Sequence, residues 1–273
     1  MEHTDAPAHA DLREWAPPVQ FQGGFQTCAA HAAASLVGYF TKKRHGRDVR
    51  LSRLFLYQVA KSFLIRGSGN GTENSGVYIR QVMGVLQLVG APPEECWPYP
   101  DPGTMATPRV SDPLLDAQPT PDCYAMAGDY RVDNYRVEAV NQQPEELLRT
   151  VKTHLADHVP FAFDFRLYPS VRQARRTGCI PFPSGSEPIL TNHAVVAMGY
   201  DDDIEIGEGV PGACHTRGAL LIKNSWSEQW GDRGYGWLPY AFILEGRCRD
   251  FWTLVWNDVW SDQAGPSPFE RVA

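Results

Sequence analysis

Hydrophobic positions in the first part of the chain recur at helical spacing. Apolar residues repeat every three or four positions from residue 28 to about residue 43, and the same spacing returns over residues 51–64 and 77–89. Ser52 stands where a helix N-cap is expected, and Gly90 follows the last stretch as a C-terminal capping glycine does. The pattern therefore predicts three successive helices.

The second part of the chain shows a different pattern. After a proline-rich segment at residues 91–122, runs of β-branched and aromatic residues indicate strands, and one helical stretch intervenes at residues 144–158. The predicted strands cover residues 160–167, 192–200, 219–224 and 251–256. Helices followed by strands predict an α+β protein.

This change of pattern also divides the chain. We expect a mainly helical lobe over residues 12–125 and a β-rich lobe over residues 126–260. Residues 1–11 and 261–273 show no periodicity, so we expect a flexible N-terminal arm and a C-terminal tail.

Composition excludes several classes of partner. The 273 residues carry a net charge of −7, so no basic surface for nucleic acid or an anionic membrane is expected. No apolar run is long enough to span a membrane, and the chain does not begin with a basic and then apolar leader. These features predict a cytoplasmic location without nucleic-acid or membrane partners, and they leave the oligomeric state open.

The six cysteines are widely scattered and form no CxxC pair. Cys28 and His31 make a CxxH, but the second half of a zinc site is missing, so neither a metal nor another cofactor is expected. The scatter favours free thiols in a reducing compartment.

Cys28 stands out because it begins the first predicted helix, directly after a polar loop that contains glycine. A thiol at a helix N-terminus lies near the positive end of the helix dipole and near unpaired N–H groups, which favour the thiolate. We therefore expect a lowered pKa and a nucleophilic role. A buried cysteine that packs as a small apolar residue is the alternative.

Two later motifs supply the groups that a thiol nucleophile needs. His193 lies at the start of a predicted apolar strand, which can aim its ring rigidly. Asn224 ends another strand, and its carboxamide can accept a hydrogen bond from that ring and fix the tautomer. Trp226 can shield this bond from water. Each motif alone is also compatible with a purely structural role.

The order of these residues resembles that of the papain-like cysteine peptidases, in particular their bacterial branch. The similarity extends from residue 11 to residue 256. The segments that carry it are residues 22–28, 51–57, 97–99, 192–195, 224–226, 230–231, 234–236 and 251–252.

The resemblance implies a two-lobed fold, with a helical left lobe, an antiparallel β-barrel-like right lobe and the active-site cleft between them. It implies that Cys28 attacks the acyl carbon, that His193 holds and then donates the proton, and that Asn224 orients His193. The side chain of Gln22 and the backbone N–H of Cys28 would form the oxyanion hole. An imidazolium at His193 would lower the pKa of Cys28 further.

The same resemblance implies a peptide substrate. Its backbone would lie along the loop that contains Asn74, Ser75 and Gly76. Further residues implied at the substrate site are Gln26, Tyr78, Asp164, Asn192, Ala194 and Trp226. Asp164 falls near the pocket for the second side chain before the scissile bond, where a carboxylate favours a basic side chain.

Several positions depart from the family pattern. Phe25 replaces a disulfide cysteine, which agrees with a reducing compartment, and Gln26 replaces a glycine at the floor of the cleft. Ser227 replaces another glycine, while Ala29 and His31 replace aromatic residues and are expected to open space under the helix.

These departures leave the reaction itself open. The leading hypothesis is a cysteine peptidase that hydrolyses an amide bond in a peptide or peptide-like substrate through a thioester. One alternative is an acyltransferase or amide-forming enzyme of a biosynthetic pathway that uses the same acyl-enzyme. The other is a non-catalytic peptide-binding protein on a peptidase scaffold.

Overall fold

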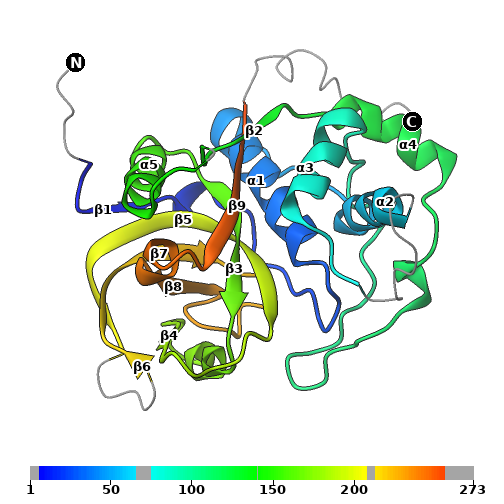
Figure 1. Ribbon diagram of the computed structural model, residues 1–273. Helices are drawn as coiled ribbons and strands as arrows, with labels where there is room; N and C mark the ends of the chain where they lie inside the picture. The colour runs from blue at the N-terminus through cyan, green and yellow to red at the C-terminus, as the bar shows by residue number, and fades with distance from the viewer. Residues whose placement is uncertain (1–5, 66–74, 140, 208–212, 256–273) are drawn as a thin grey trace.

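The helices of the first half gather on one side of the molecule (Figure 1). The computed structural model describes residues 6–65, 75–139, 141–207 and 213–255. The helices of this half are α1 (Cys28–His45), α2 (Arg53–Ile65), α3 (Ile79–Leu88) and α4 (Pro121–Ala127). The three helices predicted before residue 91 are confirmed within a few residues.

α1 is rich in alanine and is deeply enclosed. Its buried residues include Ala29, Ala33 and Leu36, and the helix packs against α2 and α3 on one side and against the sheet on the other. Small side chains allow such close approach of neighbouring elements. The helix ends at Gly46, whose φ of 64° is left-handed and whose N–H donates to the Lys42 carbonyl.

Six strands of the second half and β1 from near the N-terminus form an antiparallel sheet of seven strands. Its order is β2-β9-β3-β5-β7-β8, and β1 pairs with β5 off this path. The strands are β1 (His9–Asp11), β2 (Asn134–Arg136), β3 (Phe161–Leu167), β5 (Thr191–Ile206), β7 (Thr216–Lys223), β8 (Tyr235–Pro239) and β9 (Cys248–Leu254). β5 curls around this half of the molecule (Figure 1), and its pairing with β7 is interrupted by two register shifts.

Smaller elements complete the described part of the chain. They are the two-stranded sheet β4 (Phe182–Pro183) and β6 (Ala213–Cys214), the helices α5 (Pro144–Ala156) and α6 (Ala241–Leu244), and the 3₁₀ turns η1 (Arg13–Trp15), η2 (Pro113–Leu115), η3 (Gly128–Tyr130) and η4 (Pro169–Arg175). The predicted helix at residues 144–158 and all four predicted strands are thus present. The α+β class and the two-lobed arrangement are confirmed, while the predicted boundary between residues 125 and 126 stays a prediction.

The N-terminal segment differs from the flexible arm that the sequence predicts. Ala10 and its neighbours pair with β5 in antiparallel register, Ala10 opposite Tyr200. The Tyr200 hydroxyl also donates to the Pro7 carbonyl at 2.6 Å. Main-chain hydrogen bonds hold this three-residue strand, and so short a pairing leaves no periodicity in the sequence. The expectation of a flexible arm is therefore wrong for residues 7–11.

None of the helices among the described residues has both the length and the apolar character needed to cross a membrane.

Gly90 and Gly84 provide a matched test of the turn after α3. Gly90 has φ +83°, and a Cβ there would lie 1.9 Å from the Ala127 carbonyl oxygen, whereas a Cβ at Gly84 within α3 meets nothing within 4 Å. We expect Gly90→Ala to lower the free energy of unfolding by about 2 to 4 kcal/mol. Gly84→Ala should raise it by about 0.5 to 1 kcal/mol, because alanine is the better helix former. Urea denaturation measures both, and equal midpoints would contradict this account.

Candidate active site

The N-terminus of α1 brings Cys28 to the start of β5. Cys28 is half-buried, and the backbone N–H of Ala194 lies close enough to stabilise its thiolate, as do the N–H groups of Cys28 and Ala29. Burial nevertheless dominates and raises the pKa of the Cys28 thiol to about 11, and the nearby Asp164 carboxylate adds to the rise. The lowered pKa expected from the helix dipole alone is therefore wrong for the resting site, because desolvation outweighs it.

His193, next to Ala194 on β5, is bound to Asn224 from the neighbouring β7. His193 Nε2 lies 2.8 Å from Asn224 Oδ1, and both residues are buried. Because a carboxamide oxygen only accepts, Nε2 carries the hydrogen and Nδ1 keeps its lone pair. Trp226 stacks on the imidazole with ring centroids 4.5 Å apart, and thus covers the hydrogen bond.

The resting imidazole is neutral. Burial lowers the pKa of His193 to about 4, although the hydrogen bond to Asn224 works in the opposite direction. The neutral ring is therefore favoured at neutral pH, in contrast to the imidazolium that the family resemblance implies. Burial makes either charge alone unfavourable here, the thiolate at Cys28 as well as the imidazolium at His193.

Gln22 is held from both ends of its side chain. Its Oε1 accepts from the Ser225 hydroxyl at 2.6 Å, and its Nε2 donates to the Phe25 carbonyl at 2.6 Å. The Gln22 backbone N–H also donates to the Ser225 carbonyl at 2.9 Å, which ties the loop to the end of β7. A carboxamide nitrogen has two hydrogens, so one remains to donate after the bond to Phe25.

The segment before α3 lies against the loop before Cys28. A Cβ on Gly76 would lie 3.9 Å from the Gln26 Cβ, so these two residues are neighbours. The Tyr57 hydroxyl of α2 donates to the Ser75 carbonyl at 2.8 Å and fixes this segment. Asn74 lies outside the described residues.

Asp164 lies in the middle of β3, opposite Ala194 on β5 and opposite Arg249 on β9. Its side chain is only 6% exposed. Burial, together with the Asp250 carboxylate, raises the pKa of Asp164 to about 7, while Arg249 and Arg80 oppose this rise. The carboxyl therefore changes charge near neutral pH, close to the Cys28 thiol.

The other expected substrate residues surround this place. The Tyr78 ring, 41% exposed, lies against the guanidinium groups of Arg80 and Arg249, at 4.3 Å and 5.8 Å from the ring centroid. These are the arginines that act on Asp164, so Tyr78 and Asp164 share one neighbourhood. Asn192 is exposed at the start of β5, directly before His193.

Sequence reasoning missed several residues that contact the site loop. The space expected under α1 at His31 is filled, because Arg53 and Tyr99 pack against the imidazole there. Tyr99 also contacts Thr27, the residue before Cys28. Tyr99 stands in a motif that carries the family resemblance, but nothing in its spacing indicates which residues its hydroxyl contacts.

No three His, Cys, Asp or Glu side chains within the described ranges gather as they do around a metal ion. The six cysteines are all free thiols in the structure.

A thiol, an imidazole base and a carboxamide that fixes its tautomer are the groups with which cysteine peptidases open amide bonds. The model of the papain family cysteine proteases matches residues 6–242, and the chain belongs to that family. It is accordingly a hydrolase of the cysteine peptidase class, and the comparisons do not favour the acyltransferase or the non-catalytic alternative.

Solved structures agree with this assignment. Xylellain, a cysteine protease from Xylella fastidiosa, is similar with a TM-score of 0.72 and 29% identity over 91% of this chain and 86% of that chain. The bromelain protease from Ananas comosus, solved with the E64 inhibitor, has a TM-score of 0.60 over 92% of this chain and 100% of that one. At 18% identity, bromelain supports the fold alone.

Two curated relatives are longer than this chain. An uncharacterized peptidase C1-like protein of Acanthamoeba polyphaga mimivirus is 26% identical over 240 residues, which are 85% of this chain and 68% of that protein. Cathepsin J of Mus musculus is 28% identical over 236 residues, which are 84% of this chain and 59% of that protein. The chain therefore spans only part of the length of these relatives.

Ser225→Ala tests the clamp on Gln22. The change removes the hydroxyl that donates to Gln22 Oε1, so the carboxamide is held less firmly. We expect kcat for peptide amide hydrolysis to fall about tenfold with little change in KM, because a donor aimed at developing charge acts mainly in the transition state. Ser62→Ala on α2 is the matched control, since that hydroxyl donates to the Val59 carbonyl within its own helix. A loss confined to KM would contradict the proposed clamp.

Proposed function

We propose that Cys28, His193 and Asn224 hydrolyse an amide bond in a peptide or peptide-like substrate through a thioester intermediate. The observation that carries the proposal is the buried hydrogen bond between His193 Nε2 and Asn224 Oδ1, where His193 is next in sequence to Ala194, whose backbone N–H reaches the thiol of Cys28. This bond leaves Nδ1 as the basic atom of the ring.

The reaction proceeds by acyl transfer to sulfur and then to water. The Cys28 Sγ attacks the substrate carbonyl carbon while its proton passes to His193 Nδ1. The C–N bond breaks, and His193 returns the proton to the leaving amine. Water then attacks the thioester with His193 as base, which releases the acid and restores the thiol.

Gln22 stabilises the oxyanion formed in each step. Its second Nε2 hydrogen and the backbone N–H of Cys28 are the proposed donors, and the clamp by Ser225 and Phe25 keeps the amide in place before substrate arrives. Preorganised donors of this kind need no rearrangement as charge develops.

The substrate backbone lies along Ser75 and Gly76. Gln26 lies next to Gly76, and its side chain takes up space beside the proposed substrate backbone that a glycine would leave open. Asn192 and Ala194, on β5 next to His193, and Trp226, in the loop after β7, form the other side of the proposed site.

Asp164 and Tyr78 form the pocket for the second side chain before the scissile bond. The support is the position of Asp164 opposite Ala194, together with its influence on the pKa of Cys28. An ionised Asp164 favours a lysine or arginine side chain in that pocket.

The cytoplasm is the proposed location. Six unpaired cysteines and the phenylalanine at position 25 support a reducing compartment. The likeness to the Xylella fastidiosa protease supports a place in the bacterial branch of the family.

Cys28→Ala should abolish hydrolysis of fluorogenic peptide amides, and E64 should add once to the native protein, at Cys28. Gln22→Ala should lower kcat about 100- to 1,000-fold, because one oxyanion donor is lost. Turnover and intact mass with peptide mapping measure these effects.

Cys214→Ala, which removes an exposed thiol, is the control and should keep full activity. The proposal fails if Cys28→Ala retains activity. It also fails if native Cys28 stays inert to E64 while the unfolded chain is alkylated normally by iodoacetamide.

Asp164 should make the substrate preference depend on pH. Its pKa of about 7 leaves the carboxyl neutral below that pH and charged above it. The ratio of kcat/KM for arginine over leucine at the second position should therefore rise about tenfold as the pH increases through 7. In Asp164→Asn the ratio should stay flat, whereas the exposed Asp203→Asn should behave as the parent. If Asp164→Asn keeps the pH dependence of the parent, Asp164 is not part of the pocket that binds this side chain.

A further inference from the structure

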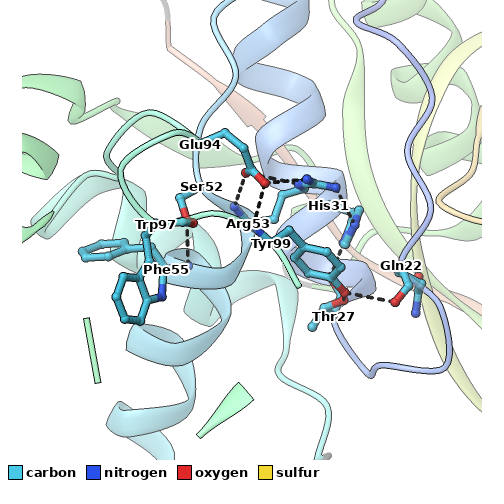
Figure 2. A network of polar contacts seen from close by, with 9 residues as sticks. All are labelled: Gln22, Thr27, His31, Ser52, Arg53, Phe55, Glu94, Trp97 and Tyr99. Carbon is cyan, nitrogen blue, oxygen red and sulfur yellow. Dashed lines mark hydrogen bonds and ion pairs between the residues drawn. The ribbon is translucent and has the colours of Figure 1, made fainter. Parts of the chain in front are cut away.

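A closed ring of polar contacts surrounds Thr27, the residue before Cys28 (Figure 2). Its five members, hereafter the Thr27 ring, are Thr27, His31, Arg53, Glu94 and Tyr99. They come from the two ends of the first turn of α1, from α2 and from the proline-rich segment after α3. The proposed mechanism uses none of them.

One half of the Thr27 ring, formed by His31 and Arg53, contacts the main chain of Thr27. His31 Nδ1 lies 3.0 Å from the Thr27 carbonyl oxygen, and His31 Nε2 lies 3.2 Å from Arg53 Nη1. Arginine only donates, so Nε2 is the acceptor and the hydrogen sits on Nδ1. Burial and the Arg53 charge hold the pKa of His31 well below its usual range, which keeps this neutral tautomer.

Glu94 closes the ring between its two halves. Its Oε1 accepts from Arg53 Nη2 at 2.6 Å and from the Tyr99 backbone N–H at 2.9 Å. The Arg53 guanidinium lies over the Tyr99 ring, 4.6 Å from its centroid. Arg53 and Glu94 are mostly buried, so solvent screens their ion pair little.

The other half of the Thr27 ring, formed by Tyr99, contacts the Thr27 side chain. The Tyr99 hydroxyl donates to the Gln22 carbonyl at 3.0 Å and lies 2.6 Å from Thr27 Oγ1. A phenol has one hydrogen, and because it goes to Gln22, the Thr27 hydroxyl must donate to Tyr99. Tyr99 thereby joins both ends of the loop that carries the proposed oxyanion donor.

This contact changes how α1 begins. Thr27 is the N-cap residue, and a threonine there normally accepts from the N–H of the second or third helical residue. Thr27 makes no such side-chain cap, and its φ of −110° and ψ of 14° depart from the extended shape of most N-caps. The second helical residue is Ala29, whose N–H is one of the groups that stabilise the Cys28 thiolate.

We propose that Tyr99 is a positioning residue for the peptidase reaction: it turns the Thr27 hydroxyl away from the start of α1 and so leaves the Ala29 N–H to the Cys28 thiolate. Without Tyr99, the Thr27 hydroxyl is released and caps the helix in the ordinary way. The helix gains a cap, and the nucleophile loses a donor. The proposal rests on the nucleophilic role of Cys28.

Tyr99→Phe removes the hydroxyl but keeps the ring under Arg53. We expect kcat to fall about tenfold with KM little changed, and the pH midpoint of Cys28 labelling by E64 to rise by about half a unit or more. Tyr124→Phe, the same change on a half-exposed tyrosine of α4, should alter neither.

Thr27→Val separates positioning from simple packing, because valine keeps the shape but has no hydroxyl to cap with. In the Thr27→Val background, Tyr99→Phe should cause almost no further change in kcat or in the labelling midpoint. The proposal is overturned if the two losses multiply, or if Tyr99→Phe lowers only the melting temperature and leaves the labelling profile of the parent. Failure of the parent itself to be labelled at Cys28 would instead refute the proposed function.

Discussion

The close packing of α1 against β5 is the constraint on which the candidate site depends. Alanines dominate the buried surface of the helix, and the strand segment beneath it is also buried and apolar. Because few long side chains stand between the two elements, the first residue of the helix reaches Ala194 and thus the neighbour of His193. Larger side chains in place of the buried alanines would push α1 away from β5, and the thiol at its first residue would move away from the imidazole.

Burial at the candidate site favours the neutral form of Cys28, Asp164 and His193 alike. It raises the pKa of Cys28 and Asp164 and lowers that of His193, so each group is neutral over more of the pH range. The same desolvation strengthens hydrogen bonds between fixed dipoles. The candidate site therefore favours the neutral forms of Cys28 and His193, and the proposed reaction relies on oriented N–H and carboxamide groups as charge develops.

The main elements of the fold were predictable from the sequence, because helical periodicity and strand composition are local signals. The candidate Cys28, His193 and Asn224 could be named from motifs, and β5 and β7 bring the latter two together. Other features depend on tertiary contacts. β1 is specified by a strand far away in the sequence, its register joining His9 to Asp201. Desolvation at Cys28 likewise depends on what covers it, which no local pattern records.

Two buried histidines show how partner chemistry separates a base from a structural group. Asn224 presents an acceptor to His193 Nε2, so the hydrogen resides there and Nδ1 keeps a basic lone pair. Arg53 presents a donor to His31 Nε2, so that lone pair is occupied and the hydrogen on Nδ1 goes to a carbonyl. Both rings are neutral, yet only the His193 ring retains a nitrogen that can accept a proton without breaking a hydrogen bond. The polarity of the partner, an amide oxygen or a guanidinium, therefore decides which histidine can serve as the base.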